Sequence, residues 1–386
     1  MKTVLFCCYG LGIGGIEKCL VNLINAMPEE DFAVDLLLMN PKYSFLPSIQ
    51  RVVTQLDSFC YVMNTTDTYR EIRERGGVTR NLVKTARYVL FRLAVKLGLR
   101  SWRTFSPIRK RYDIAVAYSQ NDYSPYYVID KVTADRKIMW YHNGAYEKSG
   151  HAYKRDQSYY SRFDYIVAVS QDCKKMLMEK FDFAAQKAVV LKNFYDVDDI
   201  KTKALEPLPR DFNSDFINIV TVGRLTREKG ADMALAACRH LVSCGRKVRW
   251  YWIGDGNQRK KIEKEIEKDH LQETFFLMGD QANPYPYMGA ADIYVQPSYY
   301  EAYSTTVCEA RALGKIIVAT DVGGMREQIK SMENGIIAPV DAKAISIAIC
   351  RLLDDVGLHE RIREAAQGNV FDPIRNMEEY KEKILK

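Results

Sequence analysis

The sequence predicts an α/β protein built from two doubly wound domains. The chain has 386 residues, which is too long for one ordinary hydrophobic core, and 47% hydrophobic with 27% charged residues is typical of a globular protein. Its most regular segments each join an apolar strand-like run to a helix-like run through a turn. We therefore expect parallel sheets whose functional residues follow the carboxyl ends of the strands.

The first segment, residues 1–26, joins a buried strand to an amphipathic helix through a glycine loop. Glycines let the main chain approach a phosphate closely. The loop contains Gly10, Gly12, Gly14 and Gly15. A dinucleotide-binding site is an alternative, because Asp35 stands about 20 residues further on, although it precedes its apolar run.

The second segment, residues 216–237, begins with the strand-like run INIVTV and continues through a turn into a helix. Arg224 and Lys229 stand five residues apart across this turn. Two cations beside a crevice suit a diphosphate leaving group. The alternative is a basic surface turn, which is common in α/β proteins.

The third segment, residues 297–324, places Glu301 and Glu309 eight residues apart, between two strand-like runs. We expect the N–H groups of Ala302 to Thr305 to open a helix and to point at an anion. Glu309, two helical turns further on, could accept hydrogen bonds from a pair of sugar hydroxyls. The pattern suits a nucleotide-sugar, and the alternative is a helix with two solvated glutamates.

These segments resemble the retaining family 4 glycosyltransferases of the GT-B fold. Matching residues are Gly14, Gly15, Glu17, Gly223, Arg224, Leu225, Lys229, Gly230, Glu301, Glu309, Ala310, Gly314, Ala319, Gly323, Gly324 and Glu327. Ala302, Tyr303 and Ser304 replace the Gly-Phe-Gly of that family. The resemblance covers nearly the whole chain and is most specific over 216–327.

The resemblance implies two Rossmann-like domains that face a central cleft. Residues 1–196 would form the acceptor-binding domain, 197–216 the linker and 217–365 the nucleotide-sugar donor domain. Residues 366–386 would form a helix that crosses back to the first domain. Asp196, Asp198 and Asp199 form an acidic run near the junction, which we interpret as solvated rather than as a metal site.

The implied reaction is retaining, metal-independent hexosyl transfer from a nucleoside-diphosphate sugar, with UDP as the commonest carrier in the family and no cofactor. Arg224 and Lys229 would stabilise the leaving diphosphate, Glu301 would orient the donor sugar rather than act as a nucleophile, and His142 would touch the transferred sugar. A structural role is the alternative for His142. The implied donor-binding residues are Gly14, Gly15, Gly279, Ala302, Tyr303, Ser304, Thr305, Thr306 and Glu309, with Gly279 beside the base and Glu309 on the ribose.

Residues 70–111 form a strongly basic stretch, with 13 basic and 2 acidic residues. Apolar residues recur in it at helical spacing: Leu82, Val83, Ala86, Leu90, Leu93, Ala94 and Leu97. Cations interleave with them: Arg80, Lys84, Arg87, Arg92 and Lys96. A basic amphipathic helix is typical of a membrane-surface element. The alternative is a core-facing helix with a solvated outer face, and no motif supports nucleic acid.

The remaining features suggest a cytoplasmic protein attached peripherally to the inner face of the cell membrane. No apolar run reaches the ~18 residues of a membrane span, and we expect no signal peptide. Nine cysteines without a CxxC pair suggest reduced thiols. The expected partners are the donor, a glycan or polyprenyl-linked acceptor and an anionic membrane. The alternatives are a nucleotide-sugar epimerase, a dehydrogenase and a degenerate GT-B scaffold of a glycan-assembly complex.

Overall fold

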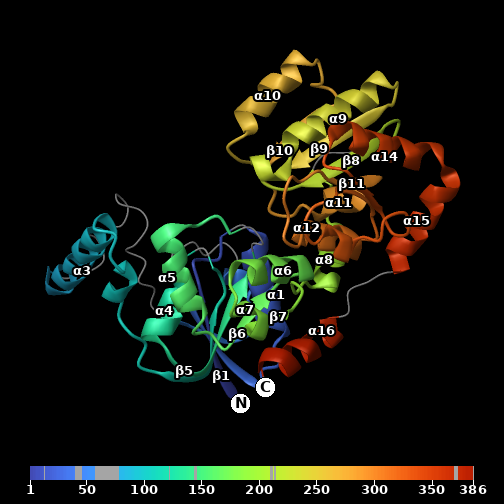
Figure 1. The fold of residues 1–386 in the computed structure, drawn as a ribbon. Coiled ribbons are helices and arrows are strands. Elements are labelled where there is room, and N and C mark those ends of the chain that lie inside the picture. The colour runs from blue at the N-terminus through green and yellow to red at the C-terminus, as the bar shows by residue number, and fades with distance from the viewer. Residues whose placement is uncertain are drawn as a thin grey trace. The chain divides into compact units, whose positions relative to one another are not determined.

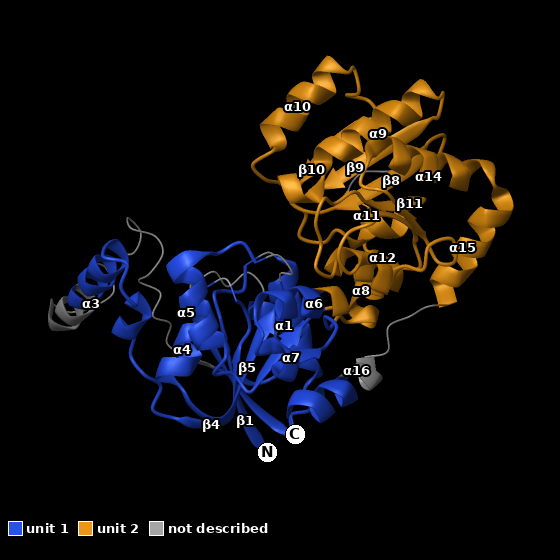
Figure 2. Ribbon diagram, viewed as in Figure 1, with its two compact units in different colours: residues 1–169, 173–194, 374–386 blue, residues 170–172, 195–373 orange. Residues whose placement is uncertain are grey.

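The computed structural model describes residues 1–12, 14–39, 46–56, 78–120, 122–142, 146–208, 212, 214–368 and 373–385, with the side chains of 55, 78–85 and 373–376 left out. The chain divides into two compact units (Figure 2). Unit 1 comprises Met1–Val169, Cys173–Phe194 and Ile374–Lys386, and unit 2 comprises Ser170–Asp172 and Tyr195–Pro373.

Unit 1 is built on a seven-stranded parallel sheet in the order β3-β2-β1-β4-β5-β6-β7 (Figure 1). The strands are β1 (Lys2–Cys8), β2 (Phe32–Leu38), β3 (Val53–Leu56), β4 (Arg111–Ala117), β5 (Thr133–Tyr141), β6 (Tyr165–Ala168) and β7 (Ala188–Val190). The central strands β1 and β2 are mostly apolar and buried, as expected for a parallel sheet covered on both faces. The strand order reverses between β1 and β4.

The helices of unit 1 follow the predicted strand-turn-helix pattern at its start. They are α1 (Gly15–Ala26), α3 (Val78–Lys96), α4 (Ser124–Lys131), α5 (Gly150–Tyr160), α6 (Gln171–Lys180), α7 (Ala184–Lys187) and α16 (Pro373–Tyr380). In α1 the apolar residues Leu20, Leu23 and Ile24 are buried, which confirms the predicted inner face of this helix.

Unit 2 has a six-stranded parallel sheet in the order β10-β9-β8-β11-β12-β13. The strands are β8 (Ile217–Val222), β9 (Val248–Ile253), β10 (Phe275–Gly279), β11 (Ile293–Gln296), β12 (Ile316–Thr320) and β13 (Ile336–Ala338). The helices are α8 (Val197–Ala204), α9 (Ala231–Ser243), α10 (Arg259–Lys268), α11 (Tyr285–Ala290), α12 (Thr305–Ala312), α13 (Met325–Gln328), α14 (Ala342–Asp354) and α15 (Val356–Gly368). One hydrophobic core joins the sheet to α9, α14 and α15 and includes Trp250, Trp252, Ile293 and Val318.

The predicted linker, 197–216, begins instead with helix α8, which packs against α11 and α12 inside unit 2. The acidic run explains why a helix starts here. The Asp196 side chain caps α8 by accepting a hydrogen bond from Asp199 N at 2.9 Å. Ile200 is buried on the inner face of the helix. Asp196 therefore has a structural role as the cap of this helix.

The C-terminal segment returns to unit 1, although it starts later than the predicted 366. Helix α15 continues to Gly368, and the returning part begins at α16. Tyr380 Oη donates to the Lys192 carbonyl at 2.6 Å, and Lys2 Nζ donates to the Leu385 carbonyl at 3.1 Å. The segment thus closes unit 1 against residues far away in the sequence.

Candidate active site

The candidate site of unit 2 lies where the strand order reverses. β8 and β11 are neighbours at this point. The strands that follow β8 in the chain, β9 and β10, lie on one side, and those that follow β11, β12 and β13, lie on the other. Ligands of open parallel sheets bind in the crevice at such a reversal, outside the carboxyl ends of the strands. The turn that carries Arg224 and Lys229 follows β8, and the loop that carries Glu301 follows β11.

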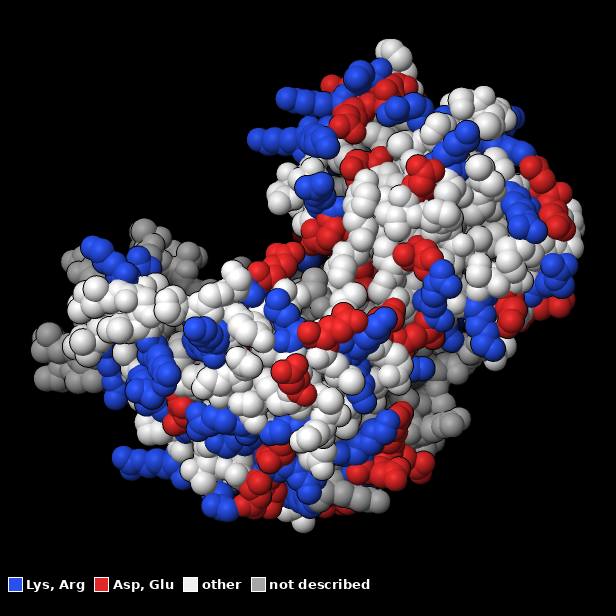
Figure 3. All heavy atoms as spheres, in the orientation of Figure 1, with Lys and Arg blue, Asp and Glu red and all other residues white. Residues whose placement is uncertain are grey.

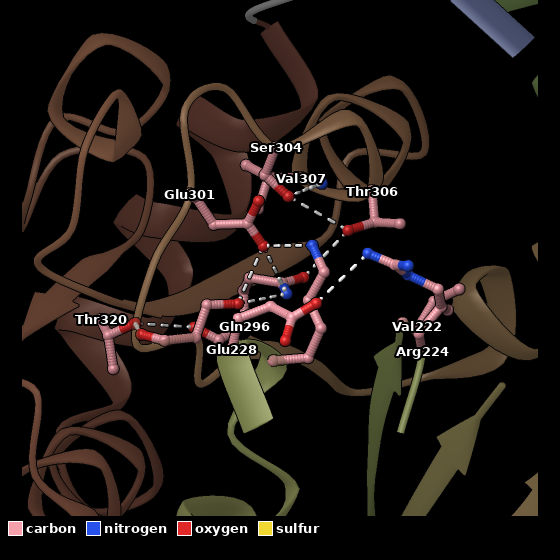
Figure 4. A network of polar contacts seen from close by, with 12 residues as sticks. Val222, Arg224, Glu228, Gln296, Glu301, Ser304, Thr306, Val307 and Thr320 are labelled. Carbon is pink, nitrogen blue, oxygen red and sulfur yellow. Dashed lines mark hydrogen bonds and ion pairs between the residues drawn. The ribbon is translucent and has the colours of Figure 1, made fainter. Parts of the chain in front are cut away.

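Glu301 is held in one orientation by three donors. Its Oε1 accepts hydrogen bonds from Lys229 Nζ at 2.7 Å, Ser298 Oγ at 2.8 Å and Gln296 Nε2 at 3.3 Å (Figure 4). The Glu301 side chain is only 8% exposed and that of Lys229 only 20%. The structure therefore brings Lys229 and Glu301 together as one buried ion pair.

Arg224 differs from Lys229, because it is exposed and pairs with a residue of its own turn rather than with Glu301. Its side chain is 68% exposed, and Nη2 pairs with Glu228 Oε1 at 3.2 Å (Figure 4). The difference arises because Arg224 precedes the turn whereas Lys229 ends it. Gly230 then turns the chain in the left-handed conformation, with φ of 73°.

Two glycine turns pack directly against the Glu301 loop. A Cβ on Gly230 would stand 1.9 Å from the Pro297 carbonyl oxygen. A Cβ on Gly323, which has φ of 45°, would stand 1.6 Å from the Glu301 carbonyl oxygen. No other residue fits at either position, so the turns after β8 and β12 together fix the main chain of the loop.

At the start of α12, one of the four N–H groups predicted to point at an anion is already used within the protein. Ser304 is the N-cap, and its own N–H already donates to Gln328 Oε1 at 2.9 Å. The Gln328 amide also donates back to the Ser304 carbonyl at 2.7 Å. In the described part of the chain, the N–H groups of Thr305 and Thr306 have no protein acceptor. This helix start can bind an anion through these two groups.

The residues Ala302 and Tyr303 are part of the packed loop. The Ala302 carbonyl accepts a hydrogen bond from Ser170 Oγ at 2.8 Å. Tyr303 is buried, and burial raises the pKa of its hydroxyl well above the ordinary value, so that the ring stays neutral. Its side chain therefore packs inside unit 2.

Glu309 lies on α12 itself, and Gly279 ends β10. Glu309 is buried, and its Oε1 accepts a hydrogen bond from Tyr285 Oη at 3.1 Å. Gly279 has φ of 70°, and its carbonyl accepts from Gly254 N at 2.8 Å. β10 is two strands from β8, about 10 Å at the usual strand spacing. A nucleoside is long enough to span this distance.

Three of the predicted residues lie in unit 1. Gly14 is the N-cap of α1 and Gly15 its first residue, and a Cβ at 14 would stand 2.2 Å from Glu17 Oε2. His142 follows β5 and is buried. Burial lowers the pKa of His142 to about 4, so the ring is neutral at pH 7. Nε2 lies 3.0 Å from the Tyr118 carbonyl, so this nitrogen carries the proton and Nδ1 is the acceptor.

The dinucleotide alternative fails at Asp35. This residue lies within β2 rather than at its carboxyl end, and it is buried. Its Oδ2 accepts from Lys110 Nζ at 2.7 Å and from Tyr112 Oη at 2.6 Å. Asp35 is thus a paired core carboxylate rather than a ribose-binding one.

Four polar residues of the site were not predicted from the sequence: Gln296, Ser298, Gln328 and Tyr285. Gln296 connects the site, because it donates to Glu301 while its Oε1 accepts from Thr306 Oγ1 at 2.9 Å. One signal was available, since a glutamine in an otherwise apolar buried strand requires hydrogen-bond partners.

The basic stretch forms the amphipathic helix α3, and its leucines face outward. Leu90, Leu93 and Leu97 are 55%, 51% and 60% exposed, whereas Phe91 is 5% exposed and stacks on Phe105 at 5.7 Å. The alternative of a core-facing stripe therefore does not hold for these three leucines. Figure 3 shows uncharged side chains gathered over α3 with Lys and Arg beside them.

The predicted membrane cations fall into two groups. Arg87, Arg92 and Lys96 are exposed on α3. Arg80 and Lys84 lie on the same helix, but their side chains are outside the described part, as are residues 70–77. Within the described residues, no helix has the length and apolarity of a membrane span.

Comparison with known proteins assigns each half of the chain to a domain type. Residues 13–199 match the model "Glycosyltransferase Family 4", and residues 207–369 match "Glycosyl transferases group 1". The chain is of the GT-B glycosyltransferase family 4 type. This assignment agrees with the two parallel-sheet units and with the motif residues after β8 and β11.

Individual relatives resemble parts of this family 4 type chain. An uncharacterized glycosyltransferase of Methanocaldococcus jannaschii is 26% identical over 166 residues, covering 42% of this chain and 41% of the relative. A Campylobacter jejuni N-acetylgalactosamine-N,N'-diacetylbacillosaminyl-diphospho-undecaprenol 4-alpha-N-acetylgalactosaminyltransferase is 26% identical over 220 residues, covering 56% of this chain and 58% of the relative. The matched segments thus span less than two thirds of these relatives.

A solved structure resembles the family 4 type chain over its full length. Anabaena Alr3699/HepE, crystallised with UDP, has a TM-score of 0.71 and 18% identity, and the match covers 100% of both chains. At this identity the likeness establishes the GT-B fold.

Proposed function

We propose that this protein is a retaining glycosyltransferase that moves a sugar from a UDP-sugar to a glycan or polyprenyl-linked acceptor at the membrane surface. One observation carries the proposal. The Lys229–Glu301 pair, at 2.7 Å, lies beside the free N–H groups of α12 at the strand-order reversal of unit 2. A cation, two anion-binding N–H groups and a fixed carboxylate are the groups that a nucleotide-sugar requires.

Each proposed donor contact uses a group with matching chemistry. The diphosphate would accept hydrogen bonds from Thr305 N, Thr306 N and Lys229 Nζ. Glu309 would accept from the ribose hydroxyls, Gly279 would lie beside the base, and Glu301 would accept from the transferred sugar. The neutral ring of His142 offers Nδ1 as an acceptor for a sugar hydroxyl.

In the proposed reaction the acceptor oxygen forms a bond to the anomeric carbon on the face that the diphosphate leaves. The bond from this carbon to the phosphate oxygen breaks, and the acceptor proton passes to the leaving phosphate. Lys229 and the α12 N–H groups stabilise the charge that develops there. Arg224 is exposed and would join them by exchanging Glu228 for the diphosphate. These positive groups supply the charge that a metal ion supplies in other transferases.

The relatives support both the donor and the acceptor class. Alr3699/HepE binds UDP in its crystal structure, and the name of the Campylobacter jejuni relative includes a diphospho-undecaprenol acceptor. The exposed leucines and cations of α3 suit a membrane surface, where such a lipid resides.

A thermal-shift screen of the pure protein against nucleoside diphosphates and their sugars, without metal, tests the donor site. We expect stabilisation by UDP or a UDP-sugar, and loss of that stabilisation in Lys229→Ala. The control is Lys260→Ala, an exposed lysine on α10. Absence of any nucleotide effect would contradict the proposal. A Glu309→Ala variant that kept full cellular function would favour the scaffold alternative.

Vesicle flotation tests the membrane surface. We expect Arg92→Glu/Lys96→Glu to weaken binding to vesicles with anionic lipid at low salt by at least about tenfold, since each cation contributes about 1 kcal/mol near such a surface. The matched control, Lys260→Glu/Lys264→Glu, reverses two exposed lysines on α10 and should bind as the unmodified protein does. Equal binding of all three proteins would contradict the assignment of α3.

A further inference from the structure

The two oxygens of the Glu301 carboxylate are used unequally. Oε1 accepts hydrogen bonds from Lys229 Nζ, Ser298 Oγ and Gln296 Nε2, so its lone pairs are fully occupied. Every hydrogen bond that the described residues donate to this carboxylate ends on Oε1. Oε2 is therefore the oxygen that remains for a ligand, and its direction depends on the groups that hold Oε1.

The Gln296 amide is fully bonded and can have only one orientation. Its Nε2 donates to Ser298 Oγ at 2.9 Å and to Glu301 Oε1 at 3.3 Å. Its Oε1 accepts from Tyr294 Oη at 2.7 Å and from Thr306 Oγ1 at 2.9 Å. An amide has two N–H donors and two lone pairs on its oxygen, so no bonding capacity remains. Reversing the amide would turn its oxygen toward the Glu301 carboxylate, which can only accept. The charge of Glu301 therefore fixes the direction in which the amide points.

Gln296 is the last residue of β11 and is completely buried. A buried amide costs free energy unless it is hydrogen-bonded, and an apolar side chain of similar shape would pack in the sheet without that cost. Its two ends instead contact groups that the proposed reaction assigns to different parts of the donor. Nε2 faces Glu301, which would bind the sugar, and Oε1 faces Thr306, whose N–H would bind the diphosphate (Figure 4). The side chain thus connects the two halves of the donor site.

We propose that Gln296 is a positioning residue, which is anchored to α12 through Thr306 and directs Oε2 of Glu301 toward a hydroxyl group of the donor sugar. The inference rests on the proposed transferase function and deepens it, because it assigns a role to a residue outside the recognised motifs. Ser304 and Gln328 hold the main chain at the start of α12 independently of this amide. Loss of the amide should therefore weaken binding of the sugar half of the donor and spare the diphosphate half.

Gln296→Met is the decisive variant, because it keeps the length of the side chain and removes all four hydrogen bonds of the amide. Ser298→Ala is the second variant, since it removes the other neutral donor to Glu301 Oε1. Thr221→Val is the matched control. Thr221 is also completely buried, and its Oγ1 donates to the Val295 carbonyl of β11 at 2.7 Å. This control therefore removes a buried hydrogen bond to the same strand without touching Glu301.

Isothermal titration calorimetry measures the binding of UDP and of UDP-glucose, UDP-galactose and their N-acetylamino forms, without acceptor. For the UDP-sugar that the unmodified protein binds most tightly, the dissociation constant is divided by that of UDP, because this ratio does not depend on the folded fraction of a sample. We expect the ratio to rise at least about tenfold in Gln296→Met, the effect of one hydrogen bond to a charged group. Ser298→Ala should shift it in the same direction, and Thr221→Val should leave it unchanged. UDP itself should bind equally to the unmodified protein and to every variant.

The outcomes separate this inference from the proposed function. An unchanged ratio in Gln296→Met, or an equal loss of UDP and UDP-sugar binding, would overturn the inference and leave the transferase function standing. The second of these results would mean that Gln296 only maintains the packing of the loop. Where Gln296→Met does not fold, an unchanged ratio in Ser298→Ala overturns the inference. A protein that binds UDP but none of the UDP-sugars would overturn it as well. If the unmodified protein binds neither UDP nor any UDP-sugar, the proposed function itself fails.

Discussion

The ion pair of Lys229 and Glu301 joins two side chains that the proposed reaction assigns to different parts of the donor. Lys229 would move toward the diphosphate, while Ser298 and Gln296 would keep Glu301 oriented toward the sugar. The three donors on one carboxylate oxygen therefore have separate uses. Two maintain the position of Glu301, and the third is available to the ligand.

The coupling of this pair can be measured without substrate. Lys229→Met leaves the Glu301 charge buried with only neutral donors, and we expect the free energy of unfolding to fall by about 1–3 kcal/mol. Adding Glu301→Gln should restore part of the loss, and urea unfolding of the four proteins measures the coupling. The exposed pair Arg363–Glu360 on α15 is the control, with an expected coupling of less than about 1 kcal/mol. Strict additivity at Lys229 and Glu301 would contradict this prediction.

Asp122 should make the stability of the protein depend on pH. Burial raises its pKa to about 6 in the folded state, against about 3.9 for an ordinary aspartate, so the folded state binds the proton more tightly. The resulting stabilisation is present below about pH 4 and is lost as pH rises through about 6. A difference of about two units corresponds to about 3 kcal/mol. The unfolding free energy of Asp122→Asn, compared with the unmodified protein, should rise by this amount between pH 4 and pH 7.5.

The neighbouring thiols do not contribute to this pH effect. Cys7 and Cys8 face it from β1, and burial, followed by other charges that include Asp122, raises the pKa of both thiols, so that they stay neutral. Asp113→Asn is the control, because hydrogen bonds from Thr3 lower the pKa of Asp113 and its pH effect has the opposite sign. Parallel pH curves for Asp122→Asn and the unmodified protein would contradict the prediction.

The sequence predicted the charged residues of the site better than the neutral ones. Glu301 and Lys229 stand in recognisable motifs, and the structure brings them together. Gln296 and Gln328 act through partners 5 to 24 residues away, which only the register of the folded chain determines. Arg224 shows the converse: its position in a motif was clear, but its pairing with Glu228 depends on the turn.

At the scale of elements, the Glu301 loop depends on the turns that pack against it. Gly323→Ala would place a methyl group 1.6 Å from the Glu301 carbonyl oxygen, in a backbone conformation that alanine adopts at a cost of about 1–2 kcal/mol. We expect the main chain at Glu301 to shift, with a fall in UDP-sugar turnover of at least about 100-fold, as small displacements of reacting groups produce.

Gly245→Ala is the matched control for this variant. Gly245 also has a left-handed φ, of 74°, but a Cβ there would meet no atom within 4 Å. It should cost about 1–2 kcal/mol of stability and leave turnover unchanged. Urea unfolding and initial rates, measured on both variants, separate backbone strain from displacement of the loop. Equal turnover in the two variants would contradict the role of the Gly323 contact.

Element boundaries were predictable where a cap or a periodic pattern marks them, and less so elsewhere. The predicted linker includes α8 because the acidic run at Asp196 was interpreted as solvated and not as the cap of a helix. For α3 the periodicity correctly indicated an amphipathic helix but not which face turns inward. The aromatic contacts of Phe91 with Phe105 and Tyr123 orient the helix and leave the leucines outside.

At the scale of the whole molecule, the chain crosses from unit 1 to unit 2 and returns. The returning segment contributes Tyr380, Ile384 and Leu385 to the buried residues of unit 1. The Tyr380 ring lies 6.1 Å from that of Trp140 and 6.2 Å from that of Phe194. Unit 1 therefore needs a segment that is synthesised only after unit 2, so its final packing cannot precede that of the whole chain.

Tyr380→Ala should destabilise unit 1 and leave the nucleotide site of unit 2 intact. Removing a buried aromatic ring costs about 3–5 kcal/mol, whereas Tyr380→Phe loses only the hydrogen bond to the Lys192 carbonyl, about 1 kcal/mol. Scanning calorimetry with and without UDP should resolve two transitions, one lowered by Tyr380→Ala and the other raised by UDP. If calorimetry instead shows one transition, which Tyr380→Ala lowers and UDP raises, then the two units unfold together. In that case the returning segment couples the stability of unit 1 to that of unit 2.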